Sequence, residues 1–358
     1  MKKLRAGIIG ATGMVGRRFA ALLAEHAWFE PLLLAASPRS AGKTYEAAVG
    51  DRWTGGAMPQ KLKNMKLVDA SDVKRIASEV DFLFCAVNMK APEVRTLEES
   101  YARAECPVIS NNSAHRSTPD VPMIIPELNA HHAGVIDYQR KRLGTKRGFI
   151  AVKSNCSIQS FVPMLYILDR RFRLQRALAC TYQAVSGAGR TLEEFSEIHD
   201  NVIPYISGEE EKSETEPQKL WGRVENGIIV PLDTPRFSAR CVRVPVSEGH
   251  LAAVYASFEI KPSLEKVTEN WSAYCGIPQR LKLPSAPERF IHCYSEPDRP
   301  QPRLDRDVER GMAVCAGGLK YDTQYDISFM GLSHNTLRGA AGGAVLLAEL
   351  LYALGYIG

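Results

Sequence analysis

The stretch LRAGIIGATGMVGRRFAALLAEH, residues 4–26, carries the clearest structural pattern in this chain. It begins with a short apolar run, continues with glycines spaced three residues apart, and ends in an apolar helical stripe that starts at Phe19. This order predicts a buried strand, a tight turn and a helix. Glycines at this spacing permit the turn, the close approach of a pyrophosphate and the packing of the helix on the sheet. The stretch therefore predicts a dinucleotide-binding unit.

The loop after the second predicted strand indicates which dinucleotide binds. That strand is PLLLAAS, residues 31–37, and its end lies where the adenosine ribose would be held. A site selective for NAD offers an acidic residue there, whereas this chain offers Ser37, Arg39 and Ser40. Hydroxyl groups and a guanidinium suit a 2′-phosphate, so the sequence predicts NADP. The alternative interpretation is a polar surface loop.

Strands and helices alternate as far as about residue 150. Two further strands are predicted at residues 81–88 and 106–113, with a helical stretch between them that carries Val94 and Leu97. The alternation predicts an α/β fold with a Rossmann-like, doubly wound parallel sheet.

The pattern then changes to one typical of an α+β domain with a mixed sheet. Its longer predicted strands are residues 176–189, 241–260 and 288–296. A small-residue helix from about Asn335 is expected to return to the first domain. We therefore expect one domain from residues 1–153 and 335–358, and a second from residues 154–334.

Composition excludes several classes of function. The 358 residues are 45% hydrophobic and 24% charged, as in an ordinary globular protein, and the net charge of +5 is spread along the chain. The densest basic run, residues 140–147, has no aromatic interleaving and is interpreted as a solvated loop, so we expect no nucleic-acid partner. Eight scattered cysteines without a CxxC pair argue against zinc or a disulfide framework. With no secretory signal and no convincing membrane span, a cytoplasmic location is expected.

One cysteine has the surroundings of a nucleophile. Cys156 stands between Asn155 and Ser157, after an apolar run and before a predicted helix whose N-terminus would stabilise a thiolate. Pro163 indicates that this helix is kinked or begins late. The alternative is one more buried sulfur, which is what most cysteines are.

A thiolate also needs a partner for its proton. His250 ends the motif RVPVSEGH, seven residues after Arg243 and directly after Gly249. An isolated histidine is more often a satisfied core or surface residue. His131 and His132 stand together but have no further ligands at metal spacing, so no metal site is expected.

Seven motifs occur together in one order and spacing: GATGMVG, NNSAHR, SNCSIQ, TYQAVSGAG, SGEEEK, RVPVSEGH and HNTLRGAAGGAVLLAELL. In these residues the chain resembles the aspartate-β-semialdehyde dehydrogenase family, in its archaeal and fungal branch. The resemblance covers nearly the whole chain. It implies NADPH-dependent reductive dephosphorylation of L-4-aspartyl phosphate to L-aspartate 4-semialdehyde, with homodimers or homotetramers formed through the second domain.

The resemblance also implies roles for individual residues. Cys156 attacks the acyl phosphate to give a thioester, and His250 acts as the acid and base for the thiol and thiohemiacetal protons. Gln183 orients the reacting groups, and Arg243 binds the α-carboxylate of the substrate.

The substrate's ammonium and phosphate groups are assigned to a glutamate and a lysine three residues apart. Glu209 and Lys212 fit this spacing, and Glu216 and Lys219 form a second pair that is left open. Phosphate binding is completed by Arg116 and Asn112. The implied cofactor contacts are Gly10, Thr12, Gly13, Met14 and Val15 at the pyrophosphate, Ser37, Arg39 and Ser40 at the 2′-phosphate, and Gly187, Gly189 and Asn335 near the nicotinamide.

Two alternatives remain at this point. A related thioester-forming reductase, such as a malonyl-CoA reductase or an N-acetylglutamyl-phosphate reductase, would keep the glycine loop and the cysteine. A non-enzymatic NADP-sensing protein would keep the fold but lack the nucleophile or the base.

Overall fold

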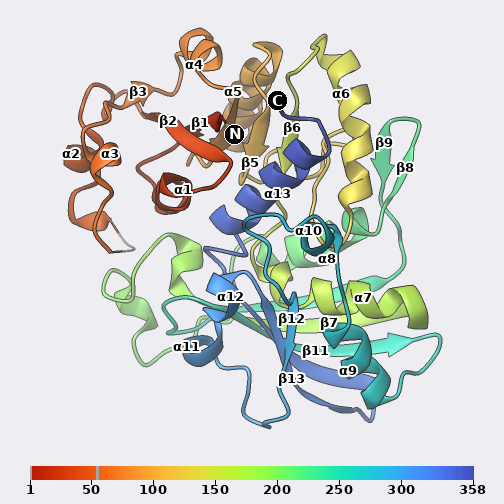
Figure 1. The fold of residues 1–358 in the computed structure, drawn as a ribbon. Coiled ribbons are helices and arrows are strands. Elements are labelled where there is room, and N and C mark those ends of the chain that lie inside the picture. Colours follow the sequence, from red (N-terminus) through yellow and green to blue (C-terminus); the bar gives the residue numbers. More distant parts are fainter. Residues whose placement is uncertain (1, 54–55) are drawn as a thin grey trace.

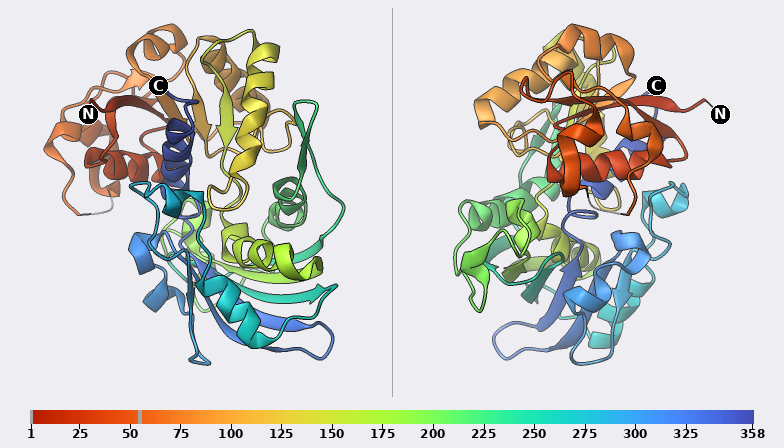
Figure 2. Two further views of the ribbon diagram at one scale, coloured as in Figure 1. Left: turned by 45° about the vertical axis from the view of Figure 1, so that its right-hand side comes forward. Right: turned by 90° about the vertical axis from the view of Figure 1, so that its left-hand side faces the viewer.

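Two six-stranded sheets organise the computed structural model, which describes residues 2–53 and 56–358. The first sheet lies in the upper half of Figure 1 and the second in the lower half. Strand β1 (Leu4–Ile9) and helix α13 (Ala341–Ala353), near the two ends of the chain, lie in the same half of the molecule (Figure 2).

The first sheet is parallel throughout, as the sequence predicts. In spatial order its strands are β3 (Val68–Asp69), β2 (Phe29–Ala36), β1, β4 (Phe82–Cys85), β5 (Val108–Ser110) and β6 (Ile150–Val152). The helices of this half are α1 (Met14–Ala24), α2 (Tyr45–Val49), α3 (Gln60–Lys63), α4 (Val73–Glu79), α5 (Ala91–Arg103), α6 (Ile136–Leu143) and α13.

Neighbouring residues of β1 pack on opposite faces of the sheet, because side chains alternate along a strand. Ile8 belongs to the core that also holds Phe19 of α1 and Leu347 of α13. Ile9 belongs to the core that holds Tyr101 of α5. Helices therefore cover both faces, and the predicted doubly wound architecture is confirmed.

The glycine motif forms the predicted turn between β1 and α1. Gly10 has a φ of +86°, and a Cβ there would lie 2.4 Å from the carbonyl oxygen of Ala86, which directly follows β4. A Cβ on Gly16 would lie 2.1 Å from the carbonyl oxygen of Gly10. Only glycine therefore allows this turn and this approach of helix to strand.

The second sheet is mixed, as predicted: two strand pairs are parallel and three are antiparallel. In spatial order its strands are β10 (Arg236–Arg243), β7 (Leu174–Gln183), β11 (His250–Phe258), β14 (Ile327–Ser333), β13 (Val314–Tyr321) and β12 (Ile291–Cys293). Around it lie α7 (Val162–Phe172), α8 (Glu209–Leu220), α9 (Leu264–Ser272), α10 (Ile277–Arg280), α11 (Pro302–Asp305), α12 (Val308–Gly311) and the hairpin β8 (Arg223–Glu225) and β9 (Ile228–Val230). Strand β12, at the edge of the sheet, is shorter than the predicted residues 288–296.

The terminal helix α13 begins at Ala341, six residues later than the sequence prediction. It packs against α1, and its residues from Ala341 to Leu351 are buried. Glu349 lies within it and binds the ring Nε2 of His26 at 2.7 Å. Across the described ranges, no helix combines the length and the apolar character needed to cross a membrane.

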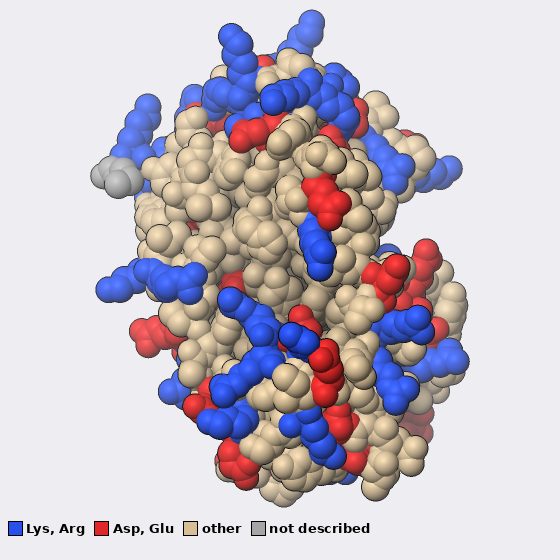
Figure 3. Space-filling view, turned by 90° about the vertical axis from the view of Figure 1, so that its right-hand side faces the viewer, with Lys and Arg blue, Asp and Glu red and all other residues tan. Residues whose placement is uncertain are grey.

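The basic run at residues 140–147 is partly helical rather than a loop. Arg140 on α6 lies over the rings of Phe149 and Tyr356, and Arg142 pairs with Asp120. These contacts consolidate the first domain. Basic and acidic side chains are intermingled over much of the face in Figure 3, with basic ones gathered at its upper end.

Candidate active site

Cys156 lies in the connection between β6 and α7, where the two halves of the molecule meet. It directly precedes a single 3-10 turn, Ser157–Ser160, and keeps part of its surface exposed. Helix α7 begins only at Val162, with Pro163 in its first turn, so the late start indicated by the proline is confirmed. Cys156 therefore precedes this 3-10 turn and not the N-terminus of α7, which starts six residues farther along and was expected to stabilise the thiolate.

His250, the first residue of β11, faces the sulfur. Its ring Nε2 lies 3.5 Å from Sγ of Cys156. Its other nitrogen, Nδ1, accepts a hydrogen bond of 3.0 Å from the backbone N–H of Ala184. Since a backbone N–H can only donate, the neutral ring in this arrangement carries its proton on Nε2.

Burial keeps both groups uncharged. It raises the pKa of Cys156 to about 11, helped by the charge of Glu209 and opposed by Lys153, Arg116 and Arg243. Burial also lowers the pKa of His250 to about 3, and Arg243 adds to this effect. The resting site therefore holds a thiol and a neutral imidazole rather than an ion pair.

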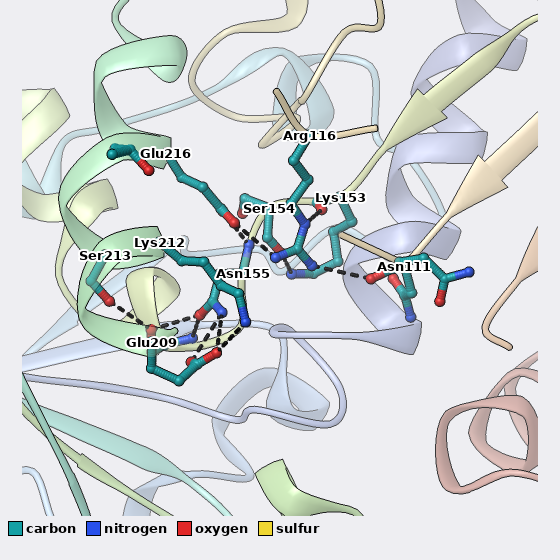
Figure 4. A network of polar contacts seen from close by, with 12 residues as sticks. Asn111, Arg116, Lys153, Ser154, Asn155, Glu209, Lys212, Ser213 and Glu216 are labelled. Carbon is teal, nitrogen blue, oxygen red and sulfur yellow. Dashed lines mark hydrogen bonds and ion pairs between the residues drawn. The ribbon is translucent and has the colours of Figure 1, made fainter. Parts of the chain in front are cut away.

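Glu209, at the start of α8, reaches the site beside the thiol. Nζ of Lys212 lies 2.9 Å from its carboxylate, and the amide of Asn155 donates to both of its oxygens (Figure 4). Gln183 at the end of β7 donates to the same carboxylate at 3.4 Å. Burial opposes its charge, but Lys212 and Asn155 outweigh that effect and lower the pKa of Glu209. The site therefore contains a carboxylate and a half-exposed ammonium.

The second glutamate and lysine of α8 are engaged in the protein itself. Glu216 pairs with Arg116 at 2.8 Å and accepts the backbone N–H of Asn155 at 2.6 Å. Nζ of the buried Lys219 donates to three backbone carbonyl groups, those of Arg116, Thr118 and Val121. This leaves Glu209 and Lys212 as the pair that can meet a ligand.

Arg116 is held in place from three sides. Besides the bond to Glu216, its Nε donates to the carbonyl oxygen of Lys153 at 3.0 Å and its Nη2 to that of Asn111 at 3.1 Å. Figure 4 shows this guanidinium between α8 and the loop that carries Lys153. The side chain is therefore fixed before any ligand binds.

Arg243, at the end of β10, is almost fully buried beside the histidine. Its Nη1 donates to the carbonyl oxygen of Ala184 at 2.7 Å. A Cβ on Gly187 would lie 2.8 Å from that nitrogen and 3.2 Å from the His250 ring. Asn335 connects the loop after β7 with the loop before β11. Its amide donates to the hydroxyl of Ser186, and its oxygen accepts from the backbone N–H of Gly249.

Asn112 turns away from this cluster. Its amide donates to Glu98 at 3.1 Å and to the sulfur of Cys85 at 3.4 Å, within the first domain. The adjacent Asn111 has no hydrogen-bond partner for its buried amide among the described residues. A contact of Asn112 with phosphate stays a prediction.

The residues assigned to the pyrophosphate and the 2′-phosphate follow the carboxyl ends of β1 and β2 in the parallel sheet. Gly13 caps α1 without a side-chain bond, which leaves the first backbone N–H groups of the helix free for phosphate oxygens. Ser37 and Arg39 follow β2 and are exposed, and Arg39 makes no hydrogen bond or ion pair within the described part of the chain. These donors suit a phosphorylated dinucleotide.

Lys153 and Asn155 have contacts that sequence reasoning missed. Asn155 was noted only as a polar neighbour of Cys156, yet it bonds both Glu209 and Glu216. Lys153 is a buried lysine directly after β6. The sequence offered one signal for the place of Lys153 near the site: this lysine stands between an apolar strand and a candidate nucleophile.

The chain is 40% identical to the aspartate-semialdehyde dehydrogenase of Aspergillus fumigatus, with 99% of each chain covered. The chain belongs to the aspartate-semialdehyde dehydrogenase family. The archaeal aspartate-semialdehyde dehydrogenase of Methanothermobacter thermautotrophicus is also 40% identical, with 97% of this chain and 99% of that protein covered. The family predicted from the motifs is confirmed.

Two family models and a solved structure agree with this assignment. Residues 5–135 match the NAD binding domain of semialdehyde dehydrogenases, and residues 166–338 match their dimerisation domain. The structure of Candida albicans aspartate-semialdehyde dehydrogenase with NADP superposes with a TM-score of 0.89 at 36% identity, covering 99% of this chain and 100% of that one. Within the dehydrogenase fold, Cys156 lies in the segment that joins the two matched regions.

Proposed function

We propose that this chain catalyses the reversible, NADPH-dependent reductive dephosphorylation of L-4-aspartyl phosphate to L-aspartate 4-semialdehyde. The reaction supplies the pathway from aspartate to lysine, methionine, threonine and isoleucine. The observation that carries the proposal is the thiol of Cys156, 3.5 Å from His250 and beside the Glu209–Lys212 ion pair. Membership of the dehydrogenase family supports it.

Cys156 provides the nucleophile. Its thiolate attacks the acyl carbon, the carbon–oxygen bond to phosphate breaks, and an aspartyl thioester and inorganic phosphate result. When bound, NADPH supplies the hydride that reduces the thioester.

His250 donates a hydrogen bond from Nε2 to the substrate oxygen on which negative charge develops. A neutral imidazole can do this only when its proton is on Nε2. Nδ1 accepts the backbone N–H of Ala184, and this hydrogen bond keeps the proton on Nε2. The lowered pKa of His250, about 3, keeps the ring neutral throughout the physiological range. The neutral ring then serves as the acid and base for the thiol and thiohemiacetal protons, which is the role implied by the family.

Four side chains divide the recognition of aspartyl phosphate. Arg243 binds the α-carboxylate, Glu209 binds the ammonium, and Lys212 and Arg116 bind the phosphate. Because Lys212 already lies against Glu209 at 2.9 Å, a substrate ammonium would take over the carboxylate and release the lysine toward the phosphate. Gln183 and Asn155 hold Glu209 in place during this exchange.

The cofactor is NADP, with the pyrophosphate at the N-terminus of α1 and the 2′-phosphate at Ser37, Arg39 and Ser40. The uncapped helix start and the unpaired Arg39 support this assignment. Residues 1–153 and 335–358 form the NADP-binding domain and residues 154–334 the catalytic and dimerisation domain. The enzyme acts as a homodimer or homotetramer in the cytoplasm.

A coupled assay tests the function. Purified protein with aspartate semialdehyde, phosphate and NADP should reduce the cofactor only when phosphate is present. Malonyl-CoA with NADPH is the matched alternative, because an acyl-CoA substrate has no ammonium for Glu209. Turnover of malonyl-CoA in preference to aspartyl phosphate would assign the chain to another thioester-forming reductase, and no turnover of either would favour an NADP sensor.

A further inference from the structure

Arg17 on α1 is a buried cation to which the proposed reaction assigns no role. It is 8% exposed, and its Nε makes one hydrogen bond, of 3.4 Å, to the carbonyl oxygen of Gly13. Its Nη1 is buried and has no hydrogen-bond partner among the described residues. No carboxylate of the described part of the chain forms an ion pair with this guanidinium, and a buried charge without a partner is costly.

The side chain of Arg17 runs back along α1 toward the glycine turn. Its backbone N–H, at 2.9 Å, and its Nε both bind the carbonyl oxygen of Gly13, the residue that caps the helix. Long side chains on a helix lean in this direction, over the turn that precedes them. The guanidinium therefore lies beside the first turn of α1, next to the backbone N–H groups that Gly13 leaves free.

The electrostatic surroundings of this guanidinium are positive. Burial and the charge of Arg52 lower the pKa of Arg17, while Tyr45 and Glu194 act in the opposite direction. The N-terminus of the helix adds partial positive charge at the same place. An anion beside the first turn of α1 would supply the counter-charge that Arg17 lacks.

Arg18, the next residue of the helix, is paired within the chain. Its guanidinium donates to both carboxylate oxygens of Glu248, at 2.8 and 3.1 Å, and so joins α1 to the loop before β11. Two adjacent arginines of one helix therefore differ in what neutralises them. A bound anion is the partner that would complete Arg17.

We propose that Arg17 binds the pyrophosphate of the dinucleotide, together with the N-terminus of α1. The pyrophosphate is the group expected at this helix start, and its two negative charges exceed the roughly half charge of a helix terminus. A guanidinium suits phosphate oxygens, because its donors lie in one plane. Arg17 then serves NAD and NADP alike, whereas Arg39 distinguishes them. This inference rests on the proposed function, since it deepens the cofactor site.

Calorimetric titration with parts of the cofactor tests the contact. ADP-ribose carries the pyrophosphate without a 2′-phosphate, and adenosine 2′-monophosphate carries the 2′-phosphate without the pyrophosphate. Full-length wild type and Arg17→Met are titrated with both ligands and with NAD and NADP. Arg18→Met, which removes the neighbouring charge, is the matched control. Circular dichroism checks that each variant is folded, and Arg17→Gln replaces Arg17→Met if the latter does not fold.

Arg17→Met should weaken binding of ADP-ribose, NAD and NADP by a similar factor, about tenfold to a hundredfold for one charge-assisted contact. Its affinity for adenosine 2′-monophosphate should equal that of wild type. Arg18→Met should change the affinity for ADP-ribose much less. The unfolding temperature of unliganded Arg17→Met should not fall, because the substitution removes a buried charge that has no partner.

Two results would overturn the contact and leave the proposed function intact. One is an unchanged affinity of folded Arg17→Met for ADP-ribose, and the other is a loss confined to ligands with a 2′-phosphate. Binding of neither NAD nor NADP by wild type would instead contradict the proposed function, and this contact with it.

Discussion

The carboxylate of Glu209 and the ammonium of Lys212 lie 2.9 Å apart on the first turn of α8, and the same carboxylate accepts a hydrogen bond from Asn155, the neighbour of Cys156. A second pair with the same spacing, about two turns farther along the helix, has no such freedom. Glu216 holds Arg116, and Lys219 is bonded to three carbonyl groups. One helix therefore presents a ligand-binding pair and, behind it, a structural pair.

Glu209→Gln should weaken binding of aspartate semialdehyde while sparing succinate semialdehyde, which lacks the amino group. The substitution keeps the size and hydrogen bonding of the side chain but removes the charge that meets an ammonium. The KM values of the two aldehydes measure the difference. Equal damage to both would place the amine contact elsewhere, with Glu216 as the next candidate.

Lys212→Ala should raise the KM for phosphate in the direction of aldehyde oxidation by about tenfold or more, as expected for one charge-assisted contact. Its folding should change little, because this side chain is half-exposed and Asn155 and Gln183 still donate hydrogen bonds to Glu209. A phosphate KM equal to that of wild type would remove Lys212 from the phosphate site.

Lys219→Ala should instead destabilise the fold, by about 3 kcal/mol or more, because it leaves three carbonyl groups without their donor. Thermal or urea unfolding measures this loss. A stable Lys219→Ala variant with a raised phosphate KM would reverse the assignment of the two pairs.

Arg39→Ala should weaken NADP binding by about 1.5–3 kcal/mol and NAD binding much less, since only NADP offers a 2′-phosphate. Titration with the two cofactors, followed by fluorescence or calorimetry, gives both dissociation constants. Similar losses for NAD and NADP would count against a 2′-phosphate contact.

His250 should make the fold less stable in acid. Its pKa is lowered to about 3 in the folded protein, from an ordinary value near 6.5 in the unfolded chain. Between these values the unfolded chain binds the additional proton, so stability falls as pH decreases from about 6.5 toward 3. His250→Gln should reduce the loss of unfolding temperature between pH 7 and pH 5, and an identical loss in both proteins would contradict a neutral buried ring.

Local sequence patterns were sufficient to predict the fold. The glycine turn and the alternation of strand and helix identify the parallel sheet, because periodicity and turn chemistry act over short stretches. The late start of α7 could also be predicted, from Pro163 alone. Strand β12 was expected to be longer, since an apolar run does not show where pairing at a sheet edge ends.

The site was only partly predictable for a physical reason. The cysteine and histidine motifs point to the reacting groups, but the contacts that separate the two pairs of α8 join distant residues. Arg116 and Glu216 are 100 positions apart, and nothing in either local stretch indicates that they meet. The burial of Lys153 likewise depends on α13, which comes nearly 200 positions later and packs against it.

Covalent trapping tests the central claim, that Cys156 is acylated by the substrate. The enzyme is mixed with aspartyl phosphate in the absence of NADPH, quenched in acid, digested and analysed by mass spectrometry, with Cys156→Ala as the control. We expect one aspartyl group on the peptide containing Cys156, together with about one equivalent of phosphate released per active site. Aspartyl transfer to another residue, or release of phosphate by Cys156→Ala at the wild-type rate, would contradict the account.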